Sequence, residues 1–241
     1  MVAGTVSSVE TDTAYDAEVA AAYDDNYSDP LSLAENRVLS RLLDETMERT
    51  PYLIPRILDV GCGTGLVPDL LRAMPQWEGY WEDRYLGVDA SIPMLNRAQQ
   101  KHTDLAFAPA RMEALGLFVY ERFNVVVSTF VLAYSEDILE AYDALEAMRA
   151  RLVDGGRLLL VTCSERFTES QQKTTNHIVN EKVEVLTFDA ETLEMLALSA
   201  GFNDVRVTGL GYGSRFAMLE YAALGKHWPD LASYLVLEAS N

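Results

Sequence analysis

Long apolar runs are missing from this sequence of 241 residues. Stretches such as Leu158–Val161 are far shorter than the about 20 residues that a membrane-spanning helix needs. The N-terminus also lacks the basic start and apolar core of a secretory signal. We therefore expect a cytoplasmic protein that has no membrane partner.

Residues that bind metals or form disulfides are scarce. The chain has two cysteines, Cys62 and Cys163, and three histidines that lie far apart in the sequence. Two cysteines form no disulfide framework, and their spacing matches no common metal site. We expect no bound metal, and we interpret both thiols as small buried groups at strand ends.

Basic residues are also few, since 19 Lys and Arg stand against 37 Asp and Glu and leave a formal net charge of −18. The basic residues are scattered, so no patch is available to bind phosphates. A strongly acidic surface repels nucleic acid backbones. We therefore expect no nucleic acid partner, and a cationic or neutral small molecule fits better as a substrate.

The rest of the composition is that of a globular protein, with 49% hydrophobic residues. After Pro55 the pattern alternates between apolar runs of strand length and amphipathic helices, with a helix start at Ser91 and a helix end at Gly201. A Gly155-Gly156 turn is expected before one strand. The alternation predicts an α/β fold with a doubly wound, mostly parallel sheet. The expected helices are 66–74, 92–101, 136–152 and 191–200, and the seven expected strands are 56–60, 84–88, 105–108, 124–128, 157–162, 205–208 and 234–238.

The sequence ILDVGCGTG places three glycines, Gly61, Gly63 and Gly65, between a strand and a helix. Such a turn lets a ligand approach the bare backbone at the carboxyl edge of a sheet. The spacing is G-x-G-x-G and not the G-x-G-x-x-G that suits a pyrophosphate. Asp59 precedes the glycines, where it would favour a cationic amino group, and Asp89 ends the next strand, where it is placed to bind ribose hydroxyls.

Taken in order, these segments resemble the class I S-adenosylmethionine-dependent methyltransferases. LDVGCGTG is similar to the glycine loop of the family, GVDASIPMLNRA to its acidic strand and following helix, and FNVVVSTFVLAY to its fourth strand. LVDGGRLLL and LEMLALSAGFNDVRV resemble later segments, so the resemblance covers about Arg56 to Phe202. It implies a Rossmann-like fold and S-adenosylmethionine as the cofactor.

The resemblance also implies which residues hold that cofactor. Asp89 matches the ribose-binding acid, Met94 follows it in the helix, and Met112 matches the adenine contact. Where the family often has an acidic residue before that contact, this chain has Arg111, and Asn124 stands where an Asp is common. The full expected set for the cofactor is Asp59, Gly61, Cys62, Gly63, Gly65, Asp89, Ala90, Met94, Arg111, Met112 and Ser128.

Residues 1–50 precede the strands and are predicted to form a helical cap on a core of residues 56–241, within one domain of residues 1–241. The run from Ala14 to Tyr27 carries Tyr15, Tyr23 and Tyr27, and Pro30 separates it from a second helix, 32–49. The tyrosines either pack the cap on the core or reach the methyl acceptor as a lid.

For the acceptor side we expect Tyr134, Tyr15 and His177, although His177 in a polar stretch is also typical of a solvated loop. Ser128–Phe130 follow the fourth strand, where they either pack or meet the acceptor, and the segment 209–230 is a further source of acceptor contacts. The methyl group arrives activated on a sulfonium, so the protein mainly aligns a nucleophile and excludes water.

The predicted function is methyl transfer to a small-molecule acceptor. A protein or nucleic acid methyltransferase is less favoured, since the basic footprint and the N/D-P-P-Y/F tetrapeptide are both missing. A third alternative is a protein that binds the cofactor for other chemistry, such as aminopropyl transfer.

Overall fold

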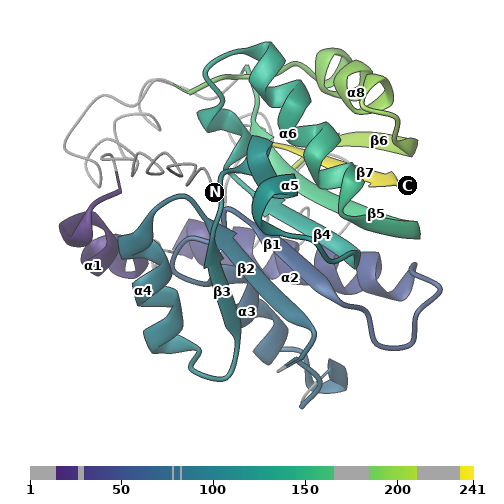
Figure 1. Cartoon of the computed structure of the whole chain (residues 1–241). Coiled ribbons are helices and arrows are strands. Elements are labelled where there is room, and N and C mark those ends of the chain that lie inside the picture. The colour runs from purple at the N-terminus through teal and green to yellow at the C-terminus, as the bar shows by residue number, and fades with distance from the viewer. Residues whose placement is uncertain (1–14, 27–29, 78, 82, 166–184, 211–233) are drawn as a thin grey trace, which may run out of the picture.

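A computed structural model of the chain describes residues 15–26, 30–77, 79–81, 83–165, 185–210 and 234–241. These residues form a seven-stranded sheet in the order β3-β2-β1-β4-β5-β7-β6 (Figure 1). The five strands β3, β2, β1, β4 and β5 are parallel to one another, and β7 is antiparallel to both of its neighbours, β5 and β6. The predicted α/β, doubly wound, mostly parallel sheet is therefore confirmed. The strands are β1 Ile57–Val60, β2 Tyr85–Asp89, β3 Ala106–Pro109, β4 Phe123–Thr129, β5 Leu152–Cys163, β6 Asn203–Gly209 and β7 Tyr234–Ser240.

The strand order reverses between β1 and β4, and ligands bind at such a switch point in open α/β sheets. The parallel strands present their carboxyl ends along one edge. Because β7 runs the opposite way, Tyr234 at its start pairs with Cys163 at the end of β5 and lies at that same edge.

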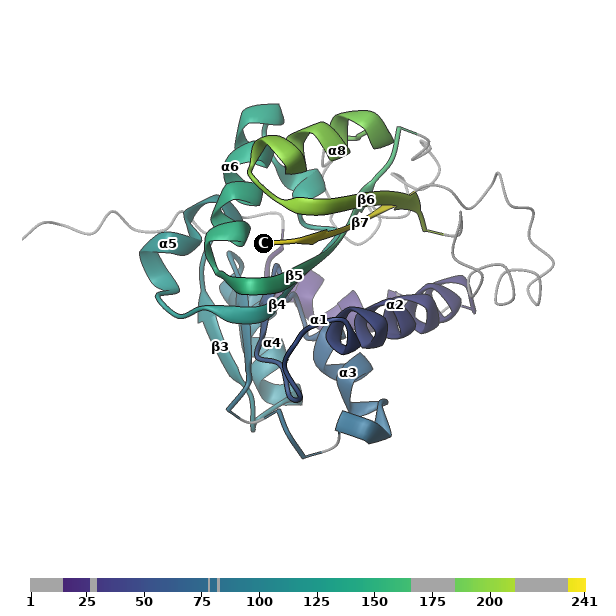
Figure 2. The ribbon, with the colours of Figure 1, turned by 90° about the vertical axis from the view of Figure 1, so that its right-hand side faces the viewer.

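Helices cover both faces of the sheet, as Figure 2 shows for α2 and α3 on one side of β5 and α6 and α8 on the other. The two faces bury separate apolar clusters. The helices are α1 Ala17–Asn26, α2 Pro30–Glu48, α3 Leu66–Arg72, α4 Ile92–Lys101, α5 Leu115–Phe118, α6 Ile138–Ala150 and α8 Ala190–Ser199. Three single 3₁₀ turns are η1 Pro75–Trp77, η2 Met112–Ala114 and η3 Leu132–Tyr134.

The two N-terminal helices differ in what they contact. Helix α2 begins at Pro30, a residue suited to the first turn of a helix, and buries Val38, Leu39 and Leu43 against the sheet. Helix α1 lies beside α4 instead, near the carboxyl edge (Figure 1). Helix α2 is therefore part of the packed core, with residues near its start also reaching the ligand edge, whereas α1 lies at that edge beside α4.

The expected turn at Gly155-Gly156 was wrong, because β5 already begins at Leu152, which pairs with Phe123. The register shifts by the next pair, and Gly155 has a φ of 72°. The two glycines thus form an irregularity inside the strand, which a left-handed residue without a Cβ permits.

The two helix signals predicted from the sequence, the start at Ser91 and the end at Gly201, are confirmed. The Ser91 side chain accepts a hydrogen bond from Met94 N at 3.3 Å and so caps α4. Gly201 follows the last turn of α8 with a φ of 89°. Asp137 caps α6 through the amides of Leu139 and Glu140, so this helix begins two residues later than predicted.

None of the helices that the structure describes is both long and apolar enough to cross a bilayer. Cys62 and Cys163 are free and buried, as expected. Within the described ranges, no group of three or more His, Cys, Asp or Glu side chains is placed to hold a metal ion.

Asn124, where the family often has an Asp, joins β4 to the residue before β1. Its Oδ1 accepts a hydrogen bond from Arg56 N at 2.7 Å, and its own N–H donates to Arg56 O at 2.9 Å. The side chain is only 8% exposed. Asn124 therefore supports the sheet by fixing β4 to the residue before β1.

Asn124→Ala should therefore lower the free energy of unfolding by about 1–3 kcal/mol, because the Arg56 amide loses a shielded acceptor. Urea denaturation measures the change, with the exposed Asn203→Ala on β6 as the control. Equal stability of the two variants would contradict the assigned role.

Candidate active site

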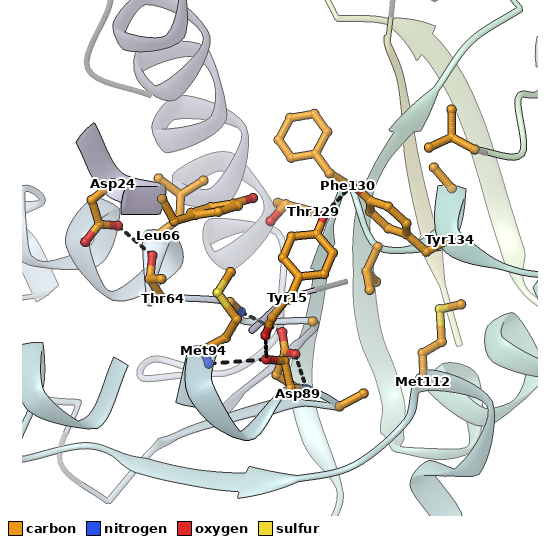
Figure 3. Close-up of a pocket in the computed structure, with 18 of the residues that line it drawn as sticks. Tyr15, Asp24, Thr64, Leu66, Asp89, Met94, Met112, Thr129, Phe130 and Tyr134 are labelled. Carbon is orange, nitrogen blue, oxygen red and sulfur yellow. Dashed lines mark hydrogen bonds between the residues drawn. The ribbon is translucent and has the colours of Figure 1, made fainter. Parts of the chain in front are cut away.

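A cavity of about 520 Å³ opens at the carboxyl edge of the sheet. It lies at the switch point between β1 and β4, and it is surrounded by residues of α1, α2 and the loops that follow β1, β2, β3, β4 and β5. Figure 3 shows many of them converging on one space. Its described lining includes Tyr15, Tyr23, Asp24, Glu35, Gly61, Gly63, Thr64, Asp89, Ala90, Met94, Lys101, Arg111, Met112, Glu113, Thr129, Phe130, Tyr134, Cys163, Val185 and Tyr234.

The glycine loop is shaped by three left-handed residues, Gly61, Gly63 and Gly65, with φ of 73°, 53° and 96°. A Cβ on Gly61 would lie 2.6 Å from Val131, and one on Gly65 would lie 2.8 Å from His102. A Cβ on Gly63 would meet only the Met94 methyl group at 3.6 Å. Two glycines therefore serve close packing, whereas Gly63 leaves its backbone open toward the cavity.

The Asp89 carboxylate holds two backbone amides at the end of β2. Its Oδ2 accepts from Gly63 N and its Oδ1 from Ser91 N, both at 2.8 Å. The side chain is half-buried and lines the cavity. Each carboxylate oxygen has further lone pairs, so Asp89 can also accept bonds from a ligand hydroxyl.

Asp59 lies beneath the glycine loop and is fully buried. Tyr85 Oη donates to its Oδ2 at 2.6 Å, while Oδ1 has no hydrogen-bond partner among the described residues. Burial raises the pKa of Asp59 to about 7; the Tyr85 hydrogen bond opposes that rise, and the nearby Asp89 charge adds to it. In the ligand-free protein, Asp59 is therefore mostly protonated below about pH 7, and a cation bound nearby would favour its ionised form.

Arg111 and Met112 follow β3 and line the cavity. The Arg111 guanidinium bonds to Glu113 and, at 3.2 Å, to Glu140. Both hydrogen bonds raise the pKa of Arg111, and the bond to Glu113 has the larger effect. The charge of Arg111 is thus balanced by two acids, and the buried Met112 side chain forms part of the cavity wall.

Tyr15 and Tyr134 meet across the cavity, as Figure 3 shows. Their hydroxyls are hydrogen-bonded, and their rings stand edge to face with centroids 5.7 Å apart. Ser91 Oγ donates to the Tyr15 carbonyl at 2.7 Å, which ties the residue just before α1 to the N-cap of α4. The two tyrosines expected on the acceptor side are therefore neighbours.

Asp24 attaches α1 to the glycine loop. Thr64 Oγ1 donates to its Oδ1 at 2.6 Å, and Lys101 Nζ lies 3.2 Å from its Oδ2. Arg97 approaches the same carboxylate at 3.7 Å. Tyr23 and Asp24 of α1 thus line one side of the cavity.

Phe130 follows β4 with a φ of 66°, a backbone conformation that residues other than glycine rarely adopt. Its amide donates to Val161 O at 2.7 Å, and its ring packs edge to face on Tyr234 at 4.9 Å. Such strain concentrates at functional sites. The conformation places an aromatic ring in the cavity wall.

The expected site residues fall into three groups. Gly61, Gly63, Asp89, Ala90, Met94, Arg111 and Met112 line the cavity, as do Tyr15 and Tyr134. Asp59, Cys62, Gly65 and Ser128 lie behind that lining and are all buried. His177, Tyr27 and the acceptor segment 209–230 from residue 211 onward lie outside the described residues.

Sequence reasoning missed Asp24, Thr64, Cys163 and Tyr234 as lining residues. Cys163 ends a parallel strand, and this position alone places it at the ligand edge. Tyr234 was hidden because it begins a strand, and only the antiparallel direction of β7 brings a strand start to that edge. Nothing local to Asp24 signals its bond with Thr64, 40 residues away.

A family model described as a methyltransferase domain matches residues 26–207. The chain is 30% identical over 185 residues to the biotin biosynthesis bifunctional protein BioHC of Teredinibacter turnerae, covering 73% of this chain and 31% of that protein. It is also 30% identical over 141 residues to the malonyl-[acyl-carrier protein] O-methyltransferase of Magnetococcus marinus, covering 57% and 49%. The chain thus spans about a third and about half of the lengths of these relatives.

Solved structures are similar in fold. The plantazolicin methyltransferase BamL, in complex with a triazolic desmethylPZN analogue and S-adenosylhomocysteine, has a TM-score of 0.68 at 13% identity, covering 97% of this chain and 94% of that one. Magnesium protoporphyrin IX methyltransferase from Synechocystis, with bound S-adenosylhomocysteine, has a TM-score of 0.62 at 16% identity, covering 96% and 95%.

Asp89→Ala should weaken binding of S-adenosylhomocysteine by about 1–3 kcal/mol, the cost of losing a charge-assisted hydrogen-bond partner. Calorimetry measures the affinity, and thermal unfolding without ligand separates the lost ligand contact from the loosening of the loops that Asp89 holds through the amides of Gly63 and Ser91. The exposed Asp83→Ala in the turn before β2 is the control. An unchanged dissociation constant in folded Asp89→Ala would remove Asp89 from the site.

Asp59 should also make the stability of the ligand-free protein depend on pH. Its pKa is about 7 in the folded chain against an ordinary 3.8, so the folded state keeps a proton that the unfolded chain releases. The contribution of Asp59 to stability therefore falls as pH rises from about 4 to about 7 and is level above that. Asp59→Asn should remove this dependence in denaturation curves between about pH 5 and 8. The exposed Asp143→Asn on α6 should keep it, and an Asp59→Asn protein with the wild-type pH dependence would show that Asp59 is ionised throughout.

Proposed function

This chain belongs to the class I S-adenosylmethionine-dependent methyltransferases, and on that premise we propose that it transfers a methyl group to a small-molecule acceptor. The observation that carries the proposal is one cavity with two kinds of wall. Glycine backbone and Asp89 form one end, and an aromatic chamber with Tyr15, Phe130 and Tyr134 forms the other. A cofactor at the first end would present its methyl group to an acceptor at the second.

The residues fit the cofactor at four points. Gly63 leaves room for close approach to its backbone, since a Cβ there would meet only Met94. Asp89 is placed to accept bonds from the ribose hydroxyls, and Met112 forms an apolar wall for the adenine. The unpartnered Oδ1 of Asp59 suits a nearby ammonium group, directly or through water. Four expected residues lie behind the lining: Asp59, Cys62, Gly65 and Ser128. They would act by supporting the glycine loop or through a bridging water.

S-adenosylmethionine supplies an activated methyl group on a sulfonium. The chain's own residues then need to position the acceptor and keep water away. We assign the positioning to Tyr15 and Tyr134, whose bonded hydroxyls offer both a donor and an acceptor to a nucleophile. His177 remains a further acceptor-side proposal.

Helix α1 is proposed to act as the cap of the site. Tyr15, Tyr23 and Asp24 line the cavity, and the bonds from Ser91 and Thr64 hold the helix against the cofactor end. Covering the cavity this way would exclude water during transfer.

A second candidate follows from the relatives, one of which is named for O-methylation of malonyl-acyl carrier protein. That acceptor is a carboxylate. In the described lining both cations, Lys101 and Arg111, are already paired with acids, so a carboxylate gains little there. Small-molecule methylation of a non-anionic group is therefore favoured.

The test of function uses cofactor with a radiolabelled methyl group and three acceptor pools: a small-molecule extract, malonyl-acyl carrier protein and total RNA. We expect label in the small-molecule fraction and not in the other two, with Asp89→Ala inactive as the control. The protein should bind S-adenosylhomocysteine and not NAD. Tight NAD binding without any response to S-adenosylhomocysteine would overturn the proposal.

Deleting residues 1–26 should leave a folded protein whose affinity for S-adenosylhomocysteine falls by about tenfold, or ~1.4 kcal/mol. Hydrogen exchange in residues 15–26 should slow when the ligand is added to the full chain. Asp24→Asn should show part of the effect and the exposed Glu18→Gln on the same helix none. Equal exchange with and without ligand, together with full affinity of the truncated protein, would show that α1 merely packs.

A further inference from the structure

We propose that the acceptor end of the cavity selects an organic amine, bound as its ammonium ion next to an aromatic group. This inference rests on the proposed function and names the substrate class for the same site. It follows from the charge of the described lining and from the side chains that form its walls.

Acids outnumber bases in that lining. The described carboxylates that face the cavity are Asp24, Glu35, Asp69, Asp89 and Glu113. Against them stand Lys101, which lies 3.2 Å from Asp24 and 3.1 Å from Asp69, and Arg111, which is bound to Glu113 and Glu140. An anionic acceptor would therefore enter a negative field, whereas an ammonium ion would be attracted by it.

The walls add a second attraction for cations. Five aromatic residues line the cavity from three separate parts of the chain: Tyr15, Tyr23, Phe130, Tyr134 and Tyr234. Tyr15 contacts both Tyr23 and Tyr134 edge to face, with centroids 6.2 and 5.7 Å apart, and Phe130 contacts Tyr234 at 4.9 Å. Aromatic faces bind ammonium groups by cation–π attraction and bind a substrate ring by stacking.

The geometry also gives the proton a route out. An ammonium nitrogen must first lose a proton. A neutral tyrosine hydroxyl can take that proton only while it releases its own, so the hydrogen-bonded hydroxyls of Tyr15 and Tyr134 would relay the proton to solvent. The nitrogen lone pair then forms the N–C bond while the C–S bond breaks with its electron pair on sulfur. The positive charge moves from sulfur to the methylated nitrogen, so charge and atoms balance.

The test is binding of three probes that share one ring and differ in one group: 2-phenylethylamine, 2-phenylethanol and 3-phenylpropanoate. Calorimetry at neutral pH, with the protein saturated with S-adenosylhomocysteine, needs no turnover. We expect the amine to bind more tightly than the carboxylate by about tenfold or more, with the alcohol between them.

Glu35→Gln should reduce the preference for amine over carboxylate, because it removes one negative charge from the cavity. The exposed Glu146→Gln on α6 makes the same change in net charge on another surface and should leave the preference unchanged. Equal or tighter binding of the carboxylate, or binding of none of the probes to the saturated protein, would overturn the inference. Failure to bind S-adenosylhomocysteine would instead overturn the proposed function.

Discussion

The bond between the Asp89 carboxylate and the amides of Gly63 and Ser91 organises the whole ligand edge. It joins the glycine loop after β1 to the start of α4 after β2. Ser91 in turn holds the Tyr15 carbonyl, and Tyr15 reaches Tyr134 after β4. One carboxylate therefore sets the relative positions of three loops and of α1, so the cofactor end and the acceptor end form a connected unit.

Much of the fold followed from the sequence because its signals are local. Strand periodicity, the Ser91 cap and the Gly201 end depend on neighbouring residues only, and the glycine spacing with Asp89 places the ligand edge. The Gly155-Gly156 irregularity was misread because the same dipeptide suits a turn, and only the pairing of Leu152 with Phe123 distinguishes the two.

The site was less predictable where it depends on contacts between distant residues. The position of Asp24 on Thr64 and the arrival of Tyr234 at the ligand edge follow from the packing of α1 and the direction of β7. The pairing of Tyr15 with Tyr134 joins residues 119 positions apart. Their residue types suggested a shared role, but their contact required the folded chain.

The left-handed backbone of Phe130 has a consequence for how such a chain can vary. Holding a phenylalanine at a φ of 66° costs of the order of 1–3 kcal/mol, which a glycine would avoid. A glycine would also remove the ring that packs on Tyr234. Selection for thermal stability alone would thus favour glycine at this position. Selection for the aromatic wall of the cavity would favour keeping phenylalanine. At Phe130 the folded chain is less stable than it would be with an unstrained residue, and the strained conformation gives the cavity its aromatic wall.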